Sequence, residues 1–206
     1  MKLLFISLGC DKNLVDSEYM LGFLKQAGIE FTDDETQADI IIVNTCGFIG
    51  DAQEESIEMI LNCCELKKQG VIKGLYVMGC LSQKFGKDLQ EEIPEVDQYY
   101  GKFNWTNLLQ DLRGKWHTEL ENRRFITTPS HYAYLKISEG CDRSCAYCAI
   151  PIITGKHVSR PMEEIIKEVE LLVSEGVKEF QIIAQELTYY GVDLYKSQKL
   201  PELIEK

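Results

Sequence analysis

Apolar and polar positions follow two different periods along the first hundred residues. Three short runs, residues 2–7, 38–44 and 74–79, are largely apolar and are typical of strands buried on both faces. Residues 13–27 and 52–67 lie between these runs and repeat apolar side chains at helical spacing. Strands that alternate with helices predict a doubly wound α/β domain, in which helices cover a parallel sheet.

The two amphipathic stretches predict which side chains face the core. In the first, the apolar face is formed by Leu14, Met20, Leu21 and Leu24, and the opposite face by Glu18, Gly22, Lys25 and Gln26. In the second, the apolar stripe is formed by Ile57, Ile60, Leu61 and Cys64, and the residues expected to face water are Glu54, Glu58 and Glu65.

The second half of the chain begins the same pattern again. Residues 104–113 predict a short helix, and the polar stretch 113–124 is the expected domain boundary. Residues 132–138 then predict a strand, Met162–Glu175 a helix and residues 178–184 the next strand. The acidic residues of that helix are expected to face water, namely Glu163, Glu164, Glu168 and Glu170.

Two domains are therefore expected, at residues 1–123 and 124–206. The second contains one complete strand-helix-strand unit, and its last residues look like the start of another helix. We expect this second domain to be cut short.

Composition limits the partners that this chain can have. Lys and Arg total 22 against 33 Asp and Glu, a formal charge of −11, so a phosphate-rich partner would be repelled. No stretch approaches the roughly 20 apolar residues that a membrane-spanning helix needs. The opening apolar run is too short for an export signal. We expect a cytoplasmic protein without a membrane anchor.

Eight cysteines are more than packing requires, and a reducing compartment argues against disulfides, so metal or redox chemistry is indicated. The densest group is Cys141, Cys145 and Cys148, at C-x3-C-x2-C spacing after a predicted strand. Three thiolates can hold three irons of a four-iron cluster and leave one iron open for a substrate. A structural zinc loop is the alternative, although zinc loops usually supply four ligands in paired spacing.

A second group of cysteines is dispersed in the sequence. Cys10, Cys46 and Cys80 each follow a predicted strand by one to three residues. The carboxyl ends of parallel strands share one edge of the sheet, so these three thiols are expected to converge. Each adjoins a glycine that would let the backbone approach a bulky inorganic ligand, namely Gly9, Gly47 or Gly79. Three ordinary buried cysteines are the alternative.

The remaining cysteines and the histidines are assigned no chemistry. Cys63 and Cys64 lie in the second predicted helix, where packing in the core is favoured over ligation. His117, His131 and His157 have no ligand spacing and are expected to be structural or surface residues.

Four segments together resemble the radical S-adenosylmethionine methylthiotransferase family. They are Ser-Leu-Gly-Cys-Asp-Lys-Asn-Leu-Val-Asp-Ser-Glu (7–18), Asn-Thr-Cys-Gly-Phe (44–48), Met-Gly-Cys (78–80) and Gly-Cys-Asp-Arg-Ser-Cys-Ala-Tyr-Cys-Ala-Ile-Pro (140–151). The aromatic residue before the last cysteine is similar to the radical superfamily signature. The resemblance covers essentially the whole chain.

The resemblance implies a fold, cofactors and ligands. It implies an N-terminal domain with an auxiliary four-iron four-sulfur cluster on Cys10, Cys46 and Cys80, followed by the start of a partial (β/α) barrel. The three cysteines of residues 141–148 would hold a second, radical cluster whose open iron binds S-adenosylmethionine. One molecule of this cofactor would donate the methyl group and another would supply the radical.

Within the family, residues 8–18 and 184–193 resemble the branch that modifies a ribosomal protein. The implied product is a β-methylthio-aspartate in the small-subunit ribosomal protein S twelve. Asp11 stands where this branch usually has proline, and Thr154 where many relatives have arginine, but neither is a ligand.

Four further residues are candidates for contacts with S-adenosylmethionine. Tyr147 resembles the family aromatic that flanks the adenine, with shielding of a cluster from water as the alternative. Arg160 matches a family basic position near the cofactor, the alternative being an exposed arginine at a helix entry. Gln185 and Glu186 end the second barrel strand, where barrels place active residues, although a solvated loop acid is the alternative for Glu186.

Three functions compete on this reasoning. The first is the protein-modifying methylthiotransferase, with an electron donor such as flavodoxin or ferredoxin and a sulfur source as partners. The second is a transfer-RNA adenosine methylthiotransferase, which would want a basic face for phosphates. The third is a non-catalytic iron-sulfur electron carrier or scaffold, which would normally close all four ligand positions. We expect this half of an enzyme not to turn over alone.

Overall fold

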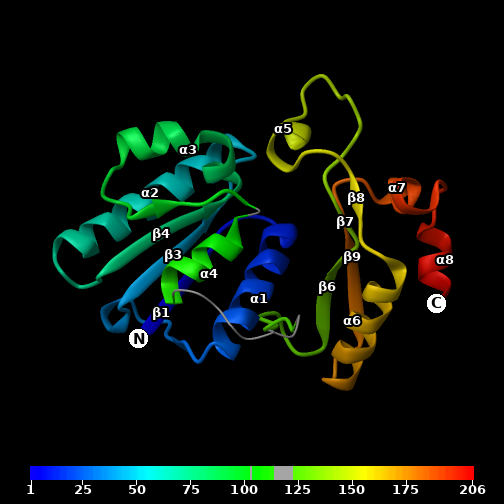
Figure 1. Cartoon of the computed structure of the whole chain (residues 1–206), viewed down its shortest axis with the longest axis horizontal. Coiled ribbons are helices and arrows are strands. Elements are labelled where there is room, and N and C mark those ends of the chain that lie inside the picture. The colour runs from blue at the N-terminus through cyan, green and yellow to red at the C-terminus, as the bar shows by residue number, and fades with distance from the viewer. Residues whose placement is uncertain (103, 114–122) are drawn as a thin grey trace. The chain divides into compact units, whose positions relative to one another are not determined.

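The computed structural model describes residues 1–102, 104–113 and 123–206, so His117 lies outside the described part. The chain forms two compact units, Met1–Phe125 and Ile126–Lys206, which are treated separately (Figure 1). Among the described residues, no helix has the length and apolar character needed to cross a membrane.

Unit 1 is built on a parallel sheet of five strands in the order β2-β1-β3-β4-β5. The strands are β1 (Lys2–Ser7), β2 (Glu30–Phe31), β3 (Ile40–Thr45), β4 (Gly74–Gly79) and β5 (Gln98–Tyr99). The order reverses between β1 and β3, which is the arrangement of a doubly wound sheet. The sequence pattern predicted the three long central strands and missed the two short edge strands, which have only two residues each.

Helices cover both faces of this sheet (Figure 1). They are α1 (Asp11–Gln26), α2 (Gly50–Lys68), α3 (Cys80–Glu92) and α4 (Trp105–Arg113), with a 3-10 turn η1 at Glu35–Gln37. Apolar residues of α2 and α3 pack with β3 and β4 in one core cluster, and those of α1 and α4 pack with the opposite sheet face in another. The pattern did not predict α3, which is kinked at Phe85 and buries only Leu81 and Leu89 among its apolar residues.

Three residues lie on a different face from the one predicted. Glu18 is fully buried, because the Arg124 guanidinium pairs with its carboxylate. Gly22 is buried because the backbone carbonyl of Arg123 occupies the space that a Cβ atom would need. Leu61 is half exposed, since Ile60 and Cys64 suffice to cover the sheet at that turn of α2.

Contacts of the connecting segment also explain where unit 1 ends. The backbone amide of Phe125 donates to Glu18 O at 3.0 Å, and the Phe125 ring lies near Phe31 and under the Lys25 ammonium. Arg124 and Phe125 therefore belong to unit 1, which places the division two residues beyond the expected boundary.

Unit 2 contains two small sheets. Strands β6 (Tyr132–Lys136) and β9 (Glu179–Ile183) are parallel, and β7 (Ser138–Glu139) and β8 (Val158–Ser159) are antiparallel. The helical elements are α5 (Ile150–Thr154), α6 (Met162–Ser174), η2 (Leu187–Tyr189), α7 (Val192–Tyr195) and α8 (Leu200–Glu205). Apolar residues of α6 pack with those of β6 and β9, so β6, α6 and β9 form the predicted strand-helix-strand unit.

Candidate cluster sites

Three cysteines of unit 1 lie at one edge of the sheet, beyond the carboxyl ends of three adjacent strands. Cys46 and Cys80 directly follow Thr45 and Gly79, which are paired across β3 and β4. Cys10 lies three residues beyond Ser7, the last residue of β1, whose partner in β3 is Asn44. The parallel register therefore brings these cysteine-bearing loops to the same place.

Glycines allow these loops to touch one another. A Cβ atom on Gly9, which has a φ of +113°, would lie 3.1 Å from the Cβ and 3.5 Å from the Sγ of Cys46. A Cβ atom on Gly79, whose φ is +105°, would lie 2.5 Å from Thr45 O. The close approach that the glycines make possible in this structure is thus to the neighbouring cysteine loop.

Gly47 gives a direct test of this packing. A Cβ atom at Gly47 would lie 2.6 Å from Leu81 N, so we expect Gly47→Ala to lower the free energy of unfolding of the apo-protein by about 1–3 kcal/mol. Gly50→Ala is the matched control, because a Cβ atom at Gly50 would have nothing within 4 Å. Urea denaturation of both variants measures the difference, and equal stabilities would contradict this packing.

The backbone around Cys46 is held by α2. Ser56 Oγ accepts a hydrogen bond from the Cys46 amide at 3.1 Å, and Ser56 is fully buried. Gln53 Nε2 donates to Gly47 O at 2.9 Å. These two contacts fix the orientation of the residue from which the Cys46 thiol projects.

The three thiols differ in environment. Cys46 is buried, Cys80 is partly buried and Cys10 is exposed, so the site is accessible from solvent on the Cys10 side. Burial raises the pKa of the Cys80 thiol to about 11, while the Lys102 ammonium acts in the opposite direction. Lys102 is itself almost fully buried and pairs with Asp16 at 3.5 Å.

Cys10, Cys46 and Cys80 supply three thiols from three separate loops. Among the described residues, no three His, Cys, Asp or Glu side chains are grouped so as to hold one metal ion. A four-iron cluster makes a different demand, since each thiolate binds its own iron and the ligands surround the cluster. Three cysteines on separate, mutually packed loops meet that demand.

Cys63 and Cys64 are confirmed as core residues. Both are only 2% exposed and lie in the core cluster between α2 and the sheet, with Ile60, Leu75 and Val77. Burial raises the pKa of Cys63 to about 12, which leaves it protonated and unreactive.

The second group of cysteines lies in unit 2, in the loop that connects β7 to β8. The loop is closed at its base, where Cys141 N donates to Gly155 O at 3.2 Å and His157 N donates to Asp142 Oδ1 at 3.0 Å. Gly140, with a φ of +76°, has no room for a Cβ atom because the Lys156 carbonyl occupies it. These contacts hold the two ends of the loop together.

Within this loop, the three thiols again differ in exposure. Cys141 is buried, Cys148 is partly buried and Cys145 is exposed. The Arg143 amide donates to Cys141 Sγ at 3.4 Å, and the Cys148 amide donates to Cys145 O at 3.1 Å. The Arg143 contact fixes the position of the Cys141 sulfur relative to the loop backbone.

The four residues predicted to contact the cofactor have different surroundings in unit 2. Tyr147 is 95% exposed and is in the cysteine loop. The Arg160 guanidinium donates to Lys136 O at 2.7 Å and pairs with Glu168 at 2.7 Å. Arg160 is therefore not an exposed helix-entry residue, and Glu168 is not on a water-facing surface as predicted.

Gln185 and Glu186 follow β9 and make separate contacts. Gln185 Nε2 donates to Glu139, which pairs with Lys136 at 2.8 Å. Hydrogen bonds from Thr188 lower the pKa of the Glu186 carboxyl, and Arg143 Nε, at 3.2 Å, lowers it further. Glu186 is thus an ionised residue tied to the cysteine loop through Arg143.

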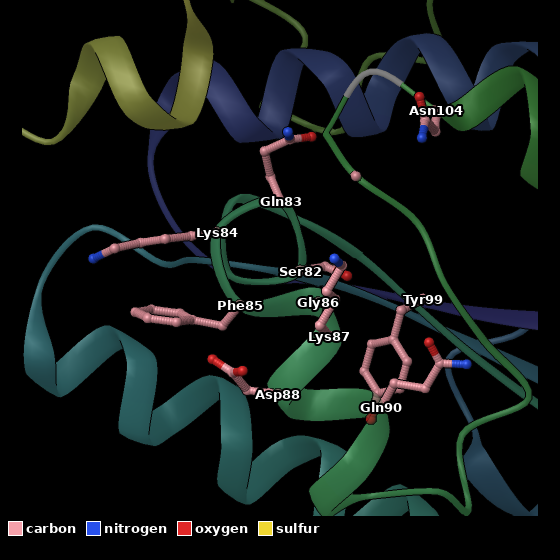
Figure 2. A pocket seen from close by; sticks show the side chains of 11 residues that line it. Ser82, Gln83, Lys84, Phe85, Gly86, Lys87, Asp88, Gln90, Tyr99 and Asn104 are labelled. Atoms are coloured by element: carbon pink, nitrogen blue, oxygen red, sulfur yellow. The ribbon is translucent and has the colours of Figure 1, made fainter.

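Unit 1 also has a polar pocket of about 500 Å³ beside the kink in α3 (Figure 2). Figure 2 shows that most of the lining side chains come from this helix, between Ser82 and Gln90. They are Ser82, Gln83, Lys84, Phe85, Gly86, Lys87, Asp88, Gln90, Tyr99, Gly101 and Asn104. These lining residues include no cysteine, so the pocket is not a cluster site.

Two family models match this chain. Residues 2–101 match the model described as "Uncharacterized protein family UPF0004", and residues 135–205 match the Radical SAM superfamily. The chain is 67% identical over 203 residues to a protein of Phocaeicola vulgatus and 64% identical over 203 residues to one of Bacteroides fragilis. Both relatives are named "Ribosomal protein uS12 methylthiotransferase RimO". The chain belongs to the radical S-adenosylmethionine methylthiotransferase family.

These matches cover different shares of this chain and of its relatives. They cover 98% of this chain but 47% of each relative, so the chain spans about half the length of the curated methylthiotransferases it matches. Two structures of the radical S-adenosylmethionine methyltransferase TsrM from Kitasatospora setae have TM-scores of 0.61 and 0.59 at 13% identity. Each match covers 99% of this chain and 50% of the TsrM chain. At this low identity the likeness concerns the fold alone. The predicted fold class, a parallel-sheet domain followed by the start of a radical domain, is confirmed.

The sequence analysis of this methylthiotransferase family member assigned no functional role to several polar residues that the structure places near the cysteines. Lys136 and Glu139 form an ion pair at the end of β6, and a lysine in an otherwise apolar strand was the available signal. His157 is buried, with its Nε2 3.0 Å from Ser159 Oγ, which agrees with a structural role. Asn13 is buried among the cysteine loops of unit 1, although it was assigned no role.

Proposed function

We propose that this chain is part of a methylthiotransferase that modifies the β-carbon of an aspartate in the small-subunit ribosomal protein S twelve, using two four-iron four-sulfur clusters. The names of the relatives support the reaction and the substrate. The observation that carries the second cluster is the register of β1, β3 and β4, which gathers Cys10, Cys46 and Cys80 at one sheet edge.

In unit 2, Cys141, Cys145 and Cys148 would hold the radical cluster, which leaves one iron open. When bound, such a cluster supplies the one-electron reductive cleavage of S-adenosylmethionine. The Arg143 amide donates to Cys141 Sγ, and the backbone hydrogen bonds at the base of the loop hold the segment that carries the three thiols. The exposed Cys145 lies where solvent and small molecules can reach it.

Residues at the carboxyl ends of β6 and β9 would bind the cofactor. Glu186 stays ionised and is fixed by Thr188 and Arg143, so it suits the ammonium group of the methionine moiety. Gln185 is oriented by Glu139, and Arg160 by Glu168 and the Lys136 carbonyl. We propose Tyr147 as a cover for the adenine, because its exposed ring is free to stack on a ligand.

In unit 1, Cys10, Cys46 and Cys80 would hold the auxiliary cluster, from which the methylated sulfur is delivered. A flavodoxin or ferredoxin would donate electrons, and a separate source would replace the sulfur. Ser56, Gln53 and the packed glycines hold the loops that carry these thiols.

The substrate assignment has a competitor in transfer RNA. An acidic chain, with 33 Asp and Glu against 22 Lys and Arg, offers little attraction for phosphates, which favours the protein substrate. Within the segment 12–18, Asn13, Ser17 and Glu18 are buried inside unit 1, so these three side chains do not contact a substrate.

The test uses the full-length protein, reconstituted anaerobically and supplied with S-adenosylmethionine and dithionite. We expect a methylthio group on one aspartate of the ribosomal protein, detected by peptide mass spectrometry, and no modification of transfer RNA. Glu186→Gln should lose at least tenfold in cofactor cleavage because it removes the charge that faces the ammonium group. Glu163→Gln, on the exposed face of α6, is the matched control.

The competing functions predict other results. Modified adenosine in transfer RNA with an unchanged ribosomal protein would favour the second hypothesis. Bound iron without any cleavage of S-adenosylmethionine would favour the electron carrier or scaffold.

A further inference from the structure

The first helix of unit 1 turns a polar face toward the cysteine loops. Asn13 and Ser17 lie one turn apart on α1, and each is about 2% exposed or less. Buried polar side chains cost free energy unless they form hydrogen bonds, so the partners of these two residues show what the face is for.

Asn13 joins two of the three cysteine loops. Its Nδ2 donates to Leu8 O at 2.9 Å and to Thr45 O at 3.2 Å. Leu8 lies two residues before Cys10, and Thr45 lies immediately before Cys46. A side-chain amide has two protons to donate, and both are used to hold these two carbonyls together.

The third loop meets the other end of the same amide. Cys80 Sγ lies 3.9 Å from Asn13 Oδ1 and donates to it in the free thiol. A thiolate bound to iron has no proton to donate, so this contact belongs to the protein without iron. The Asn13 side chain is nevertheless adjacent to all three loops.

A second layer fixes Asn13 itself. Asn44 Nδ2 donates to Ser17 Oγ at 2.8 Å and to Asn13 O at 3.3 Å. Ser17 Oγ also lies 2.8 Å from Ser7 Oγ, at the end of β1. The carboxyl ends of β1 and β3 and the first turns of α1 are therefore tied together by buried hydrogen bonds.

We propose that Asn13 is a positioning residue for the auxiliary cluster, one that sets the separation of the Cys10 and Cys46 loops. This inference rests on the proposed function, because it requires that Cys10, Cys46 and Cys80 bind iron. An apolar side chain of similar size would leave the Leu8 and Thr45 carbonyls without this donor, and the two loops would no longer share a fixed point.

The experiment isolates one cluster in the full-length protein. Cys141, Cys145 and Cys148 are all replaced by alanine, and the protein is reconstituted anaerobically, so that about four irons per chain report the auxiliary site alone. We expect Asn13→Leu in this background to lose at least half of the iron and to shift the g values of the dithionite-reduced cluster in electron paramagnetic resonance.

Two controls separate positioning from general destabilisation. Met20→Ala removes a core side chain from the same helix, and Asn62→Leu makes the same chemical change on the exposed surface of α2. Both should keep the iron content and the g values of the parent. If circular dichroism shows that Asn13→Leu does not fold, Asn13→Ser takes its place, because it removes the amide without adding bulk.

The outcomes distinguish a failure of the Asn13 positioning role from a failure of the proposed auxiliary cluster. Parental iron content and g values in the Asn13 variant would overturn the positioning role. If replacing Cys10, Cys46 and Cys80 by serine leaves about four irons in the same background, the auxiliary site itself is misplaced. Loss of iron in the cysteine variant together with a shifted signal in the Asn13 variant supports both.

Discussion

Replacement of Cys10, Cys46 and Cys80 by serine is expected to lower the iron content of the anaerobically reconstituted, full-length protein from about eight to about four atoms per chain. The reason is the parallel register, which sets the three loops side by side while the 141–148 loop folds separately in unit 2. Iron and sulfide analysis measures the change. Cleavage of S-adenosylmethionine should persist in this variant, whereas transfer of the methylthio group should be lost.

The matched control removes thiols that are not placed to bind iron. Cys63→Ala together with Cys64→Ala removes two buried thiols of α2 from the core of unit 1. This variant should keep about eight irons per chain. If the parent and the triple serine variant both contain about four irons, the strand-end cysteines are structural. The protein would then be a radical enzyme with a single cluster and a different reaction.

Replacement of Arg124 by leucine is expected to lower the free energy of unfolding of the apo-protein by about 3–5 kcal/mol. The Arg124 guanidinium and the Glu18 carboxylate are 2% and 0% exposed, so the variant would leave a buried carboxylate without its counter-charge. The guanidinium also lies over the Tyr19 ring, 5.4 Å from its centroid, and that contact would be lost as well. Urea denaturation, followed by the fluorescence of the aromatic residues, gives the difference.

A double-mutant cycle identifies the ion pair as the cause. Glu18→Leu combined with Arg124→Leu should cost less than the sum of the two single variants, because no charge then remains buried. Lys87→Leu changes an exposed cation on α3 of the same unit and should cost about 0.5 kcal/mol or less. Additive single and double variants would contradict the role given to the pair.

The pair also changes the interpretation of the segment 12–18. This segment resembles a branch of the family that modifies a ribosomal protein, and on sequence alone it looked like a mark of substrate choice. In the structure Asn13 and Ser17 face the cysteine loops, and Glu18 holds the end of unit 1. These three side chains serve the inside of the domain, so their part in the motif is explained by the fold and not by substrate contact.

The sequence by itself determined the elements that depend on local pattern. The central strands β1, β3 and β4 are continuous apolar runs, and α1, α2 and α6 have helical periodicity, so each was predictable from its own residues. The short strands β2 and β5 and the kinked α3 have too little pattern of their own and depend on neighbours for their hydrogen bonds. The positions of the cysteines relative to the predicted strands were also enough to indicate a common sheet edge.

Only the tertiary structure decided how the polar residues are used. The helical periodicity predicted a water-facing Glu18, because it depends only on the apolar residues of the same helix. It contains no information about Arg124, which is 106 residues away. The same holds for Asn13, whose partners are carbonyls at the ends of two different strands. A local pattern predicts which surface is apolar, whereas a buried hydrogen bond or ion pair depends on groups that only the folded chain brings within reach.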